Sequence, residues 1–286
     1  PESTLPIAPP VASSTLRVEC PHAERCGGCP AIGMTYGEQL AMKRGRVVQS
    51  VARYPALELV YTEPVLAADP IVEYRARAKL IVAPGGQIGL FAKGGGHQVV
   101  DIPECRVLAP SLAEVVTALR AKIAEDEANG GPLAAFDPQG VGRGALRAVD
   151  LREVRDPEPR VLVTLVAQRE LSPSIEALGK TARALAQSVP SIAGIAVNFH
   201  EGEAPQILGS ETVVLFGETS MRDRLGESIH RATYGSFVQA HRGQAQRVHK
   251  MLAKAFSLDK PSPKPPSVLD LYGGSGAIAL GLAAAG

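Results

Sequence analysis

Apolar and polar residues follow a helical period in several stretches of this chain. Residues 36–53 combine apolar positions such as Leu40 and Val51 with Lys and Arg on the remaining faces, which predicts an amphipathic helix with one basic side. A second helix is predicted to start at Ser111, because Glu114 follows three residues later as in a capping box. Its apolar stripe consists of Leu112, Val115, Val116, Leu119 and Ile123.

Other segments have the composition and alternation of strands. They cover residues 71–82, 87–92 and 97–102, the paired runs ALRAVDLREV and RVLVTLVAQ, the run SIAGIAVNFH, and short strands between 206 and 239. Two more helices are predicted, one opening at Ser172 and Pro173 and one over about 241–256 with Val248, Met251, Leu252 and Phe256 on one face. Turn formers at 126–144 and PSPKPP at 261–266 predict connections. The fold class is therefore α/β and α+β.

Four cysteines form the first chemical signal. Three lie in CPHAERCGGC as Cys20, Cys26 and Cys29, and Cys105 is the natural distant fourth ligand. This C-x5-C-x2-C spacing favours an iron-sulfur cluster over structural zinc, which prefers two close cysteine pairs. Unligated or catalytic thiols are a third interpretation, whereas the absence of a secretory signal argues against disulfides. The glycines at 27 and 28 are expected to give the loop its backbone freedom.

Charge and length narrow the partners only slightly. The 286 residues carry a formal net charge of +1, and they suffice for two or three domains. Residues 220–254 contain seven Lys or Arg against Asp223 and Glu227, which suits phosphate contact but also an ordinary solvated surface. No run approaches the length of a membrane span, so a soluble cytoplasmic protein is expected.

A glycine-rich turn forms the second chemical signal. Val268 to Leu271 is predicted as an apolar strand, Tyr272 to Gly276 as a turn, and Ala277 to Ala285 as a helix. This order opens nucleotide-binding doubly wound sheets, because glycine lets the backbone approach a ligand. Asp270 favours S-adenosylmethionine over a dinucleotide, although a βα turn that binds nothing is the ordinary alternative.

The order of these motifs resembles one family from Arg17 onward, the bacterial RNA (uracil-5-)-methyltransferases that act on 23S rRNA. The similar segments are CPHAERCGGCP, VEYRARAKL, VVDIPECRVLAP, GSFVQAHRGQAQRV and VLDLYGGSGAIAL. The resemblance implies a 4Fe-4S cluster held by the four cysteines and S-adenosylmethionine as cofactor. Its implied cofactor-binding residues are Gln239, Asp270, Tyr272, Gly273, Gly274 and Gly276, and its implied RNA-binding residues are Arg75, Arg77 and Lys79.

The chain also departs from this family. Gly273 stands where many members have cysteine, Ala277 replaces a polar residue, and His241 replaces a common asparagine. The family's nucleophilic cysteine and its carboxylate base belong to motifs after the glycine turn, and all four cysteines here are assigned to the cluster. The expectation is a methyltransferase fragment that lacks catalytic residues and is inactive alone.

The expected organisation has three parts. Residues 1–16 form a flexible Pro/Ser-rich leader, 17–235 an iron-sulfur and RNA-binding central domain with antiparallel sheets, and 236–286 the incomplete start of a Rossmann-like methyltransferase domain. We expect a monomer that binds RNA, with rRNA preferred over tRNA, and that does not bind a membrane. The main alternative is an iron-sulfur RNA-binding module without catalysis, and a nicotinamide-dependent iron-sulfur oxidoreductase ranks last.

Overall fold

The computed structural model describes residues 15–137, 140, 144–202, 206–258, 264 and 266–285. The predicted leader up to residue 14 and most of the linker at 261–266 lie outside the described residues. Among the described helices, none is both long and apolar enough to cross a bilayer.

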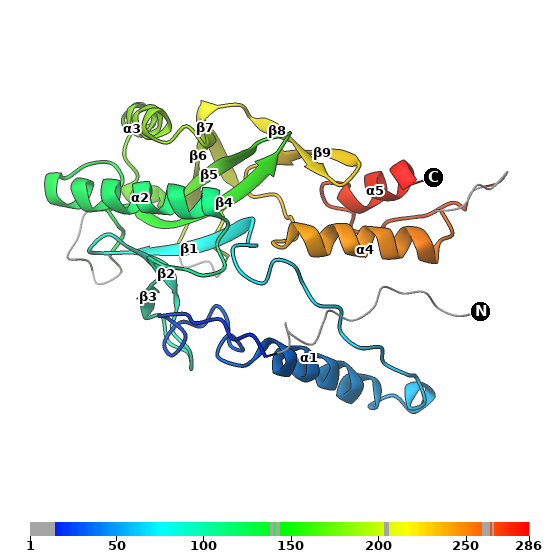
Figure 1. The fold of residues 1–286 in the computed structure, drawn as a ribbon. Coiled ribbons are helices and arrows are strands. Elements are labelled where there is room, and N and C mark those ends of the chain that lie inside the picture. Colours follow the sequence, from blue (N-terminus) through cyan, green and yellow to red (C-terminus); the bar gives the residue numbers. More distant parts are fainter. Residues whose placement is uncertain are drawn as a thin grey trace.

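A seven-stranded sheet forms the centre of the protein (Figure 1). Its strand order is β3-β2-β1-β4-β5-β6-β7, and every neighbouring pair is antiparallel except β5 and β6. The strands are β1 (Arg77–Ala83), β2 (Gln87–Phe91), β3 (Val99–Asp101), β4 (Leu146–Arg155), β5 (Pro159–Gln168), β6 (Ile192–His200) and β7 (Glu211–Gly217). The parallel pair needs a crossover, which the helix α3 (Ile175–Ser188) provides.

One face of the sheet is covered by α3 and by the long helix α2 (Pro110–Asn129) (Figure 1). Val149 of β4, Val163 of β5 and Ile195 of β6 point to this face and are fully buried. They share one core cluster with the whole predicted α2 stripe. This core fixes the sheet and the ends of its strands.

The opposite face carries a second, smaller layer. It begins with the hairpin of β8 (Ser220–Leu225) and β9 (Ser228–Thr233), which packs against β4. Residues that alternate with those of the main core, such as Val154 and Leu162, contact the hairpin residue Ala232. The helices α4 (Arg242–Ala255) and α5 (Ala277–Ala285) lie on the other side of the hairpin (Figure 1).

The N-terminal part packs at the β1 and β2 end of the molecule. Residues 17–34 form the cysteine loop, and α1 (Tyr36–Val51) follows, capped by reciprocal contacts between Thr35 and Glu38. Only Tyr36 of α1 is buried, so this helix depends on its local contacts. Two short 3₁₀ helices, Pro55–Leu57 and Arg169–Leu171, complete the described elements.

Most predicted elements form, but several boundaries were wrong. The second helix has Ala109 as its N-cap and Pro110 in its first turn, while the Ser111 hydroxyl donates instead to Glu153 Oε2 at 2.6 Å. The predicted connection at 126–144 is partly helical and partly buried, because α2 continues to residue 129 and Leu133 packs in the core.

The strand predicted at Val268 to Leu271 is absent from the described structure. A parallel strand needs a hydrogen-bonding neighbour, and no described segment pairs with it. Leu269 and Leu271 are consequently 81% and 69% exposed. The mixed α/β fold is therefore observed, with a largely antiparallel sheet, whereas the expected doubly wound arrangement is not.

Candidate functional site

The four cysteines come together around one small cavity. Cys20, Cys26, Cys29 and Cys105 all line a space of about 50 Å³, although the last is far from the others in sequence. Cys26 pairs with Ala92 in an isolated bridge, which holds the loop against the end of β2. Packing between the loop and the sheet therefore gathers the thiols that the sequence analysis grouped.

Glycine is required in this loop because of close approach. A side chain at Gly27 would come within 2.8 Å of the Phe91 carbonyl oxygen, and one at Gly28 would come within 2.5 Å of Leu90 Cδ1. Neither glycine has a left-handed backbone, so the expected conformational freedom was the wrong reason. The Gly27 N–H donates to the Phe91 carbonyl at 3.0 Å, which seats the loop on the strand.

The thiols that share this cavity are all partly buried. Within the described part of the chain, no three His, Cys, Asp or Glu side chains gather closely enough to hold a single ion. Burial raises the pKa of the Cys29 thiol; the charge of Arg75 lowers it, and the other three cysteines raise it further. What the structure shows is four thiols at one cavity.

A second cavity, of about 320 Å³, lies beside the glycine turn. The N-terminal half of α4, the segment before it and the turn itself enclose it. Five of the six predicted cofactor-binding residues line this cavity, namely Gln239, Asp270, Tyr272, Gly273 and Gly274. Its volume lies within the usual range of small-molecule pockets. Gly276 does not line it and acts in the turn, where its N–H donates to the Gly273 carbonyl at 2.8 Å.

The turn requires glycine at two positions. Gly274 and Gly276 have φ values of 57° and 75°, which residues with a side chain adopt only with strain. A side chain at Gly274 would meet no atom within 4 Å, so a ligand can approach its backbone closely. Asp270 Oδ2 is buried without a hydrogen-bond partner in the described residues. These features fit a polar small molecule that supplies a donor to Asp270.

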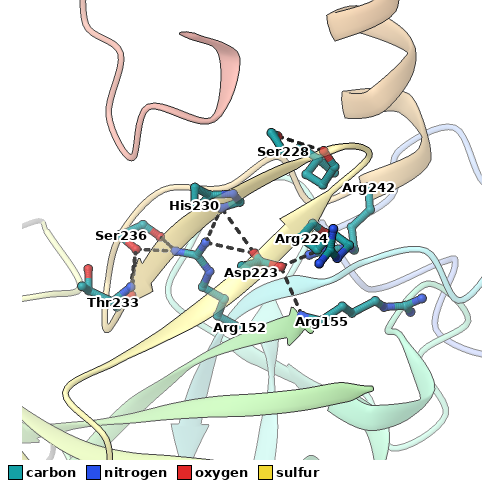
Figure 2. Close-up of polar contacts among 10 residues, drawn as sticks. Arg152, Arg155, Asp223, Arg224, Ser228, His230, Thr233, Ser236 and Arg242 are labelled. Atoms are coloured by element: carbon teal, nitrogen blue, oxygen red, sulfur yellow. Dashed lines mark hydrogen bonds and ion pairs between the residues drawn. The ribbon is translucent and has the colours of Figure 1, made fainter. Parts of the chain in front are cut away.

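A buried ionic group fixes α4 against the rest of the protein (Figure 2). Asp223 of β8 has no exposed surface, and its carboxylate accepts from Arg242 Nη2 at 2.8 Å and from Arg152 Nη2 at 3.2 Å. His230 Nε2 lies 3.4 Å from the same carboxylate, and the Arg155 N–H donates to it at 3.1 Å. Because Arg152 belongs to β4 and Arg242 to the first turn of α4, Asp223 joins sheet, hairpin and helix.

The titration of Asp223 reflects these contacts. Burial alone raises its pKa, but hydrogen bonds from His230 and Arg242 and the charge of Arg242 outweigh burial and hold the pKa well below its ordinary value. Burial lowers the pKa of Arg152, and the charge of Asp223 opposes this. Sequence reasoning missed this group, for which the only signal is a local excess of basic residues, because its members lie far apart along the chain.

The three residues predicted to contact RNA lie in different surroundings. The Arg77 guanidinium is occupied by the buried Asp150 carboxylate, with a 2.8 Å contact from Nη2 to Oδ2. Arg75 and Lys79 both line the cysteine cavity, and Lys79 is exposed. An RNA contact by Arg77 stays a prediction, but its guanidinium is already paired with Asp150 inside the protein.

Comparisons with known proteins show that the chain is similar to RNA methyltransferases. It is 29% identical over 280 residues to an uncharacterised RNA methyltransferase of Geobacter sulfurreducens, covering 97% of this chain and 54% of that protein. An uncharacterised RNA methyltransferase of Halalkalibacterium halodurans is 26% identical over 277 residues, covering 96% and 57%. The chain thus spans about half the length of these curated relatives. No protein-family model matches it.

A solved structure has the same fold. The tRNA (uracil-54, C5)-methyltransferase of Pyrococcus abyssi, in complex with S-adenosyl-L-homocysteine, superposes with a TM-score of 0.66 over 90% of this chain and 56% of that one. The sequence identity is 21%, so this likeness concerns the fold.

Proposed function

We propose that this chain is part of an S-adenosylmethionine-dependent RNA (uracil-5-)-methyltransferase. The observation that carries the proposal is the cavity beside the glycine turn, which combines glycine backbone, the unpartnered Asp270 oxygen and Gln239. The similarity to RNA methyltransferases over 97% of the chain supports it, as does the fold of a relative that binds S-adenosyl-L-homocysteine.

The cofactor would supply an activated methyl group for C5 of a uridine. The chain's own residues would bind and orient it: the backbone at Gly273 and Gly274 through close approach, Asp270 as an acceptor, and Gln239 and Tyr272 at the sides of the cavity. The chain has four cysteines, and all four line the other cavity. No cysteine remains beside the glycine turn to attack the uracil ring, so we propose that these residues provide binding and do not transfer the methyl group alone.

We propose further that the four cysteines hold a structural 4Fe-4S cluster. Their common cavity and the C-x5-C-x2-C spacing of three of them support this assignment. Protein purified without oxygen should contain about four irons and four acid-labile sulfides per chain, following the cysteine count. Stoichiometric zinc instead would refute the cluster.

The proposed substrate is a uridine in RNA, with 23S rRNA preferred and tRNA as the alternative. The proposed organisation keeps 17–235 as the central domain and 236–286 as the start of the methyltransferase domain, in a monomer. Binding of rRNA and tRNA fragments, compared side by side, tests the preference. Binding to RNA without any binding of S-adenosylhomocysteine would favour a non-catalytic RNA-binding module.

Binding of S-adenosylhomocysteine by calorimetry tests the cofactor site directly. Gly274→Val should abolish binding, because its side chain would enter the cavity. Gly202→Val is a matched control: Gly202 has φ 58° against 57° for Gly274, and both have open space around them. Equal binding by the two variants would refute the assignment of the site, because strain alone affects both.

A further inference from the structure

A third cavity, of about 420 Å³, lies between the cysteine loop, α1 and the start of α4. In Figure 1 the chain returns from the end of α1 to β1 between these two helices. This return segment is tied to both helices: the Ala68 N–H donates to the Tyr36 hydroxyl at 2.6 Å, and Arg247 donates to the Ala67 carbonyl. The walls of the cavity are therefore fixed by contacts on each side.

Cationic side chains line this cavity, beside the Cys29 thiol that it shares with the cysteine cavity. Lys43 and Arg46 from α1 and Arg75 from the segment before β1 line it, and its described lining includes no Asp or Glu. Lys43 and Arg46 are exposed, and no ion pair within the described part of the chain neutralises either one. Two uncompensated cations at the rim of a cavity attract an anionic group such as a phosphate.

Two aromatic rings form part of the cavity wall. The rings of Tyr74 and His241 stack with centroids 4.7 Å apart and an interplanar angle of 16°. The Gln244 N–H donates to His241 Nδ1 at 3.2 Å, and His241 Nε2 lies 3.0 Å from the Pro70 carbonyl oxygen. These two backbone contacts, one at each ring nitrogen, hold the imidazole in one orientation. A fixed aromatic pair is a stacking surface for a nucleobase.

This cavity shares a wall with the proposed cofactor cavity. His241 and Gln244 line both of them. An occupant of the third cavity therefore lies next to the site where the target base would meet the cofactor. Its volume is within the range of small-molecule pockets and is adequate for one nucleotide.

We propose that this cavity binds a nucleotide that flanks the target uridine in single-stranded RNA. The base would stack against the Tyr74 and His241 pair, the amides of Gln39 and Gln244 would face its edge, and Lys43 and Arg46 would contact the phosphates at the rim. This inference rests on the proposed function and deepens it, because RNA recognition would then depend on the nucleotide next to the target uridine as well as on the uridine itself.

Fluorescence anisotropy with short single-stranded oligoribonucleotides containing one uridine tests the charged rim. The double variant Lys43→Gln with Arg46→Gln should weaken binding roughly 10-fold and reduce the salt slope by about 1 for each phosphate that is no longer neutralised. The matched control is Lys180→Gln with Arg183→Gln, which also removes one lysine and one arginine, but from α3 at the other end of the sheet. This control should change the affinity for RNA less than about 2-fold.

A second pair of variants tests the aromatic wall. Tyr74→Leu should weaken RNA binding roughly 10-fold because it removes a stacking surface, and Tyr74→Phe should restore it. Both variants are checked by circular dichroism and by S-adenosylhomocysteine affinity, which should equal that of the wild type. In a separate arm, a 4-thiouridine beside the target uridine should crosslink to the peptide that contains Tyr74.

The outcomes separate this inference from the proposed function. If the wild type binds both S-adenosylhomocysteine and RNA, but the cavity variants behave like the α3 control, the flanking-nucleotide pocket is refuted and the proposed function stands. Uridine monophosphate that binds as tightly as the oligonucleotide would also refute it, because the cavity would then be a small-molecule site. Failure to bind S-adenosylhomocysteine would refute the proposed function independently.

Discussion

The seven-stranded sheet and the glycine-turn segment at 266–285 have similar apolar patterns but opposite surroundings. In the sheet, Leu151 is fully buried between neighbouring strands and α2. In the turn segment, the equally apolar Leu269 and Leu271 are 81% and 69% exposed. An apolar run becomes a strand only where a neighbouring strand can take up its hydrogen bonds, so sequence pattern alone does not distinguish the two cases.

The largest expected effect comes from Asp223, because it links the sheet to α4, the helix against which α5 of the turn segment packs. Asp223→Ala should lower the free energy of unfolding by about 3–5 kcal/mol, since it leaves the buried Arg152 without its counter-charge. Urea denaturation measures this. Asp156→Ala is the control: it pairs with Arg222 and Arg224 of the same hairpin, but these side chains are exposed, so the cost should stay below about 1 kcal/mol. Equal losses of unfolding free energy in the two variants would show that burial does not determine how much these ion pairs stabilise the protein.

The next effect compares the two apolar segments directly. Leu151→Ala should cost about 2–5 kcal/mol, because it opens a cavity in the main core. Leu271→Ala should stay within about 0.5 kcal/mol, because that side chain contributes little buried area. Denaturant midpoints of the two variants measure the difference. A similar cost for both would mean that Leu271 is buried in solution, contrary to the structure.

The acid dependence of stability should also depend on the link between the regions. The folded-state pKa of Asp223 is lowered, so its contribution to stability is present above the unfolded carboxyl pKa of about 4 and is lost as pH falls through the folded pKa. The wild type should therefore lose stability more steeply than Asp223→Asn as pH falls below about 4. Parallel curves from chemical denaturation over this pH range would contradict the assigned role.

Local signals allowed much of the fold to be predicted. The α2 stripe from Leu112 to Ile123 is buried as its spacing indicates. The paired strands β4 and β5 also form around a short turn; β5 is rich in β-branched residues, whereas β4 has only Val149 and Val154. In contrast, Val248 and Met251 on the predicted apolar face are about half exposed, since α4 packs through Ala245 and Ala253 instead.

The candidate sites were predictable to the extent that their residues are close in sequence. The cysteine loop and the glycine turn are local motifs, and each lines a cavity. The contacts of Asp223 with Arg152 and of His241 with Tyr74 span long stretches of chain. No periodicity or spacing indicates such contacts, because they depend on how the hairpin and α4 pack on the sheet.

The smallest expected effect concerns α1, which resembles neither the buried sheet nor the unpaired turn segment. It buries only Tyr36, and its first turn is held by the Thr35 capping box, in which the Thr35 N–H donates to Glu38 Oε2 at 2.7 Å. Thr35→Ala should cost about 1 kcal/mol. Because few tertiary contacts bind this helix, the loss should appear as faster amide exchange within α1 rather than as a lower global stability.

Ser174→Ala is the matched variant for this last test. Ser174 caps α3 with a single contact, to the Ala177 N–H at 3.2 Å, but α3 packs in the main core through Leu178 and Leu185. Loss of the Ser174 cap should therefore lower the global stability, with little increase in amide exchange confined to α3. The same exchange pattern in both helices would mean that tertiary contacts hold α1 as firmly as they hold α3. The opposite patterns would show that α1, which lines the third cavity with Lys43 and Arg46, opens independently of the global unfolding transition.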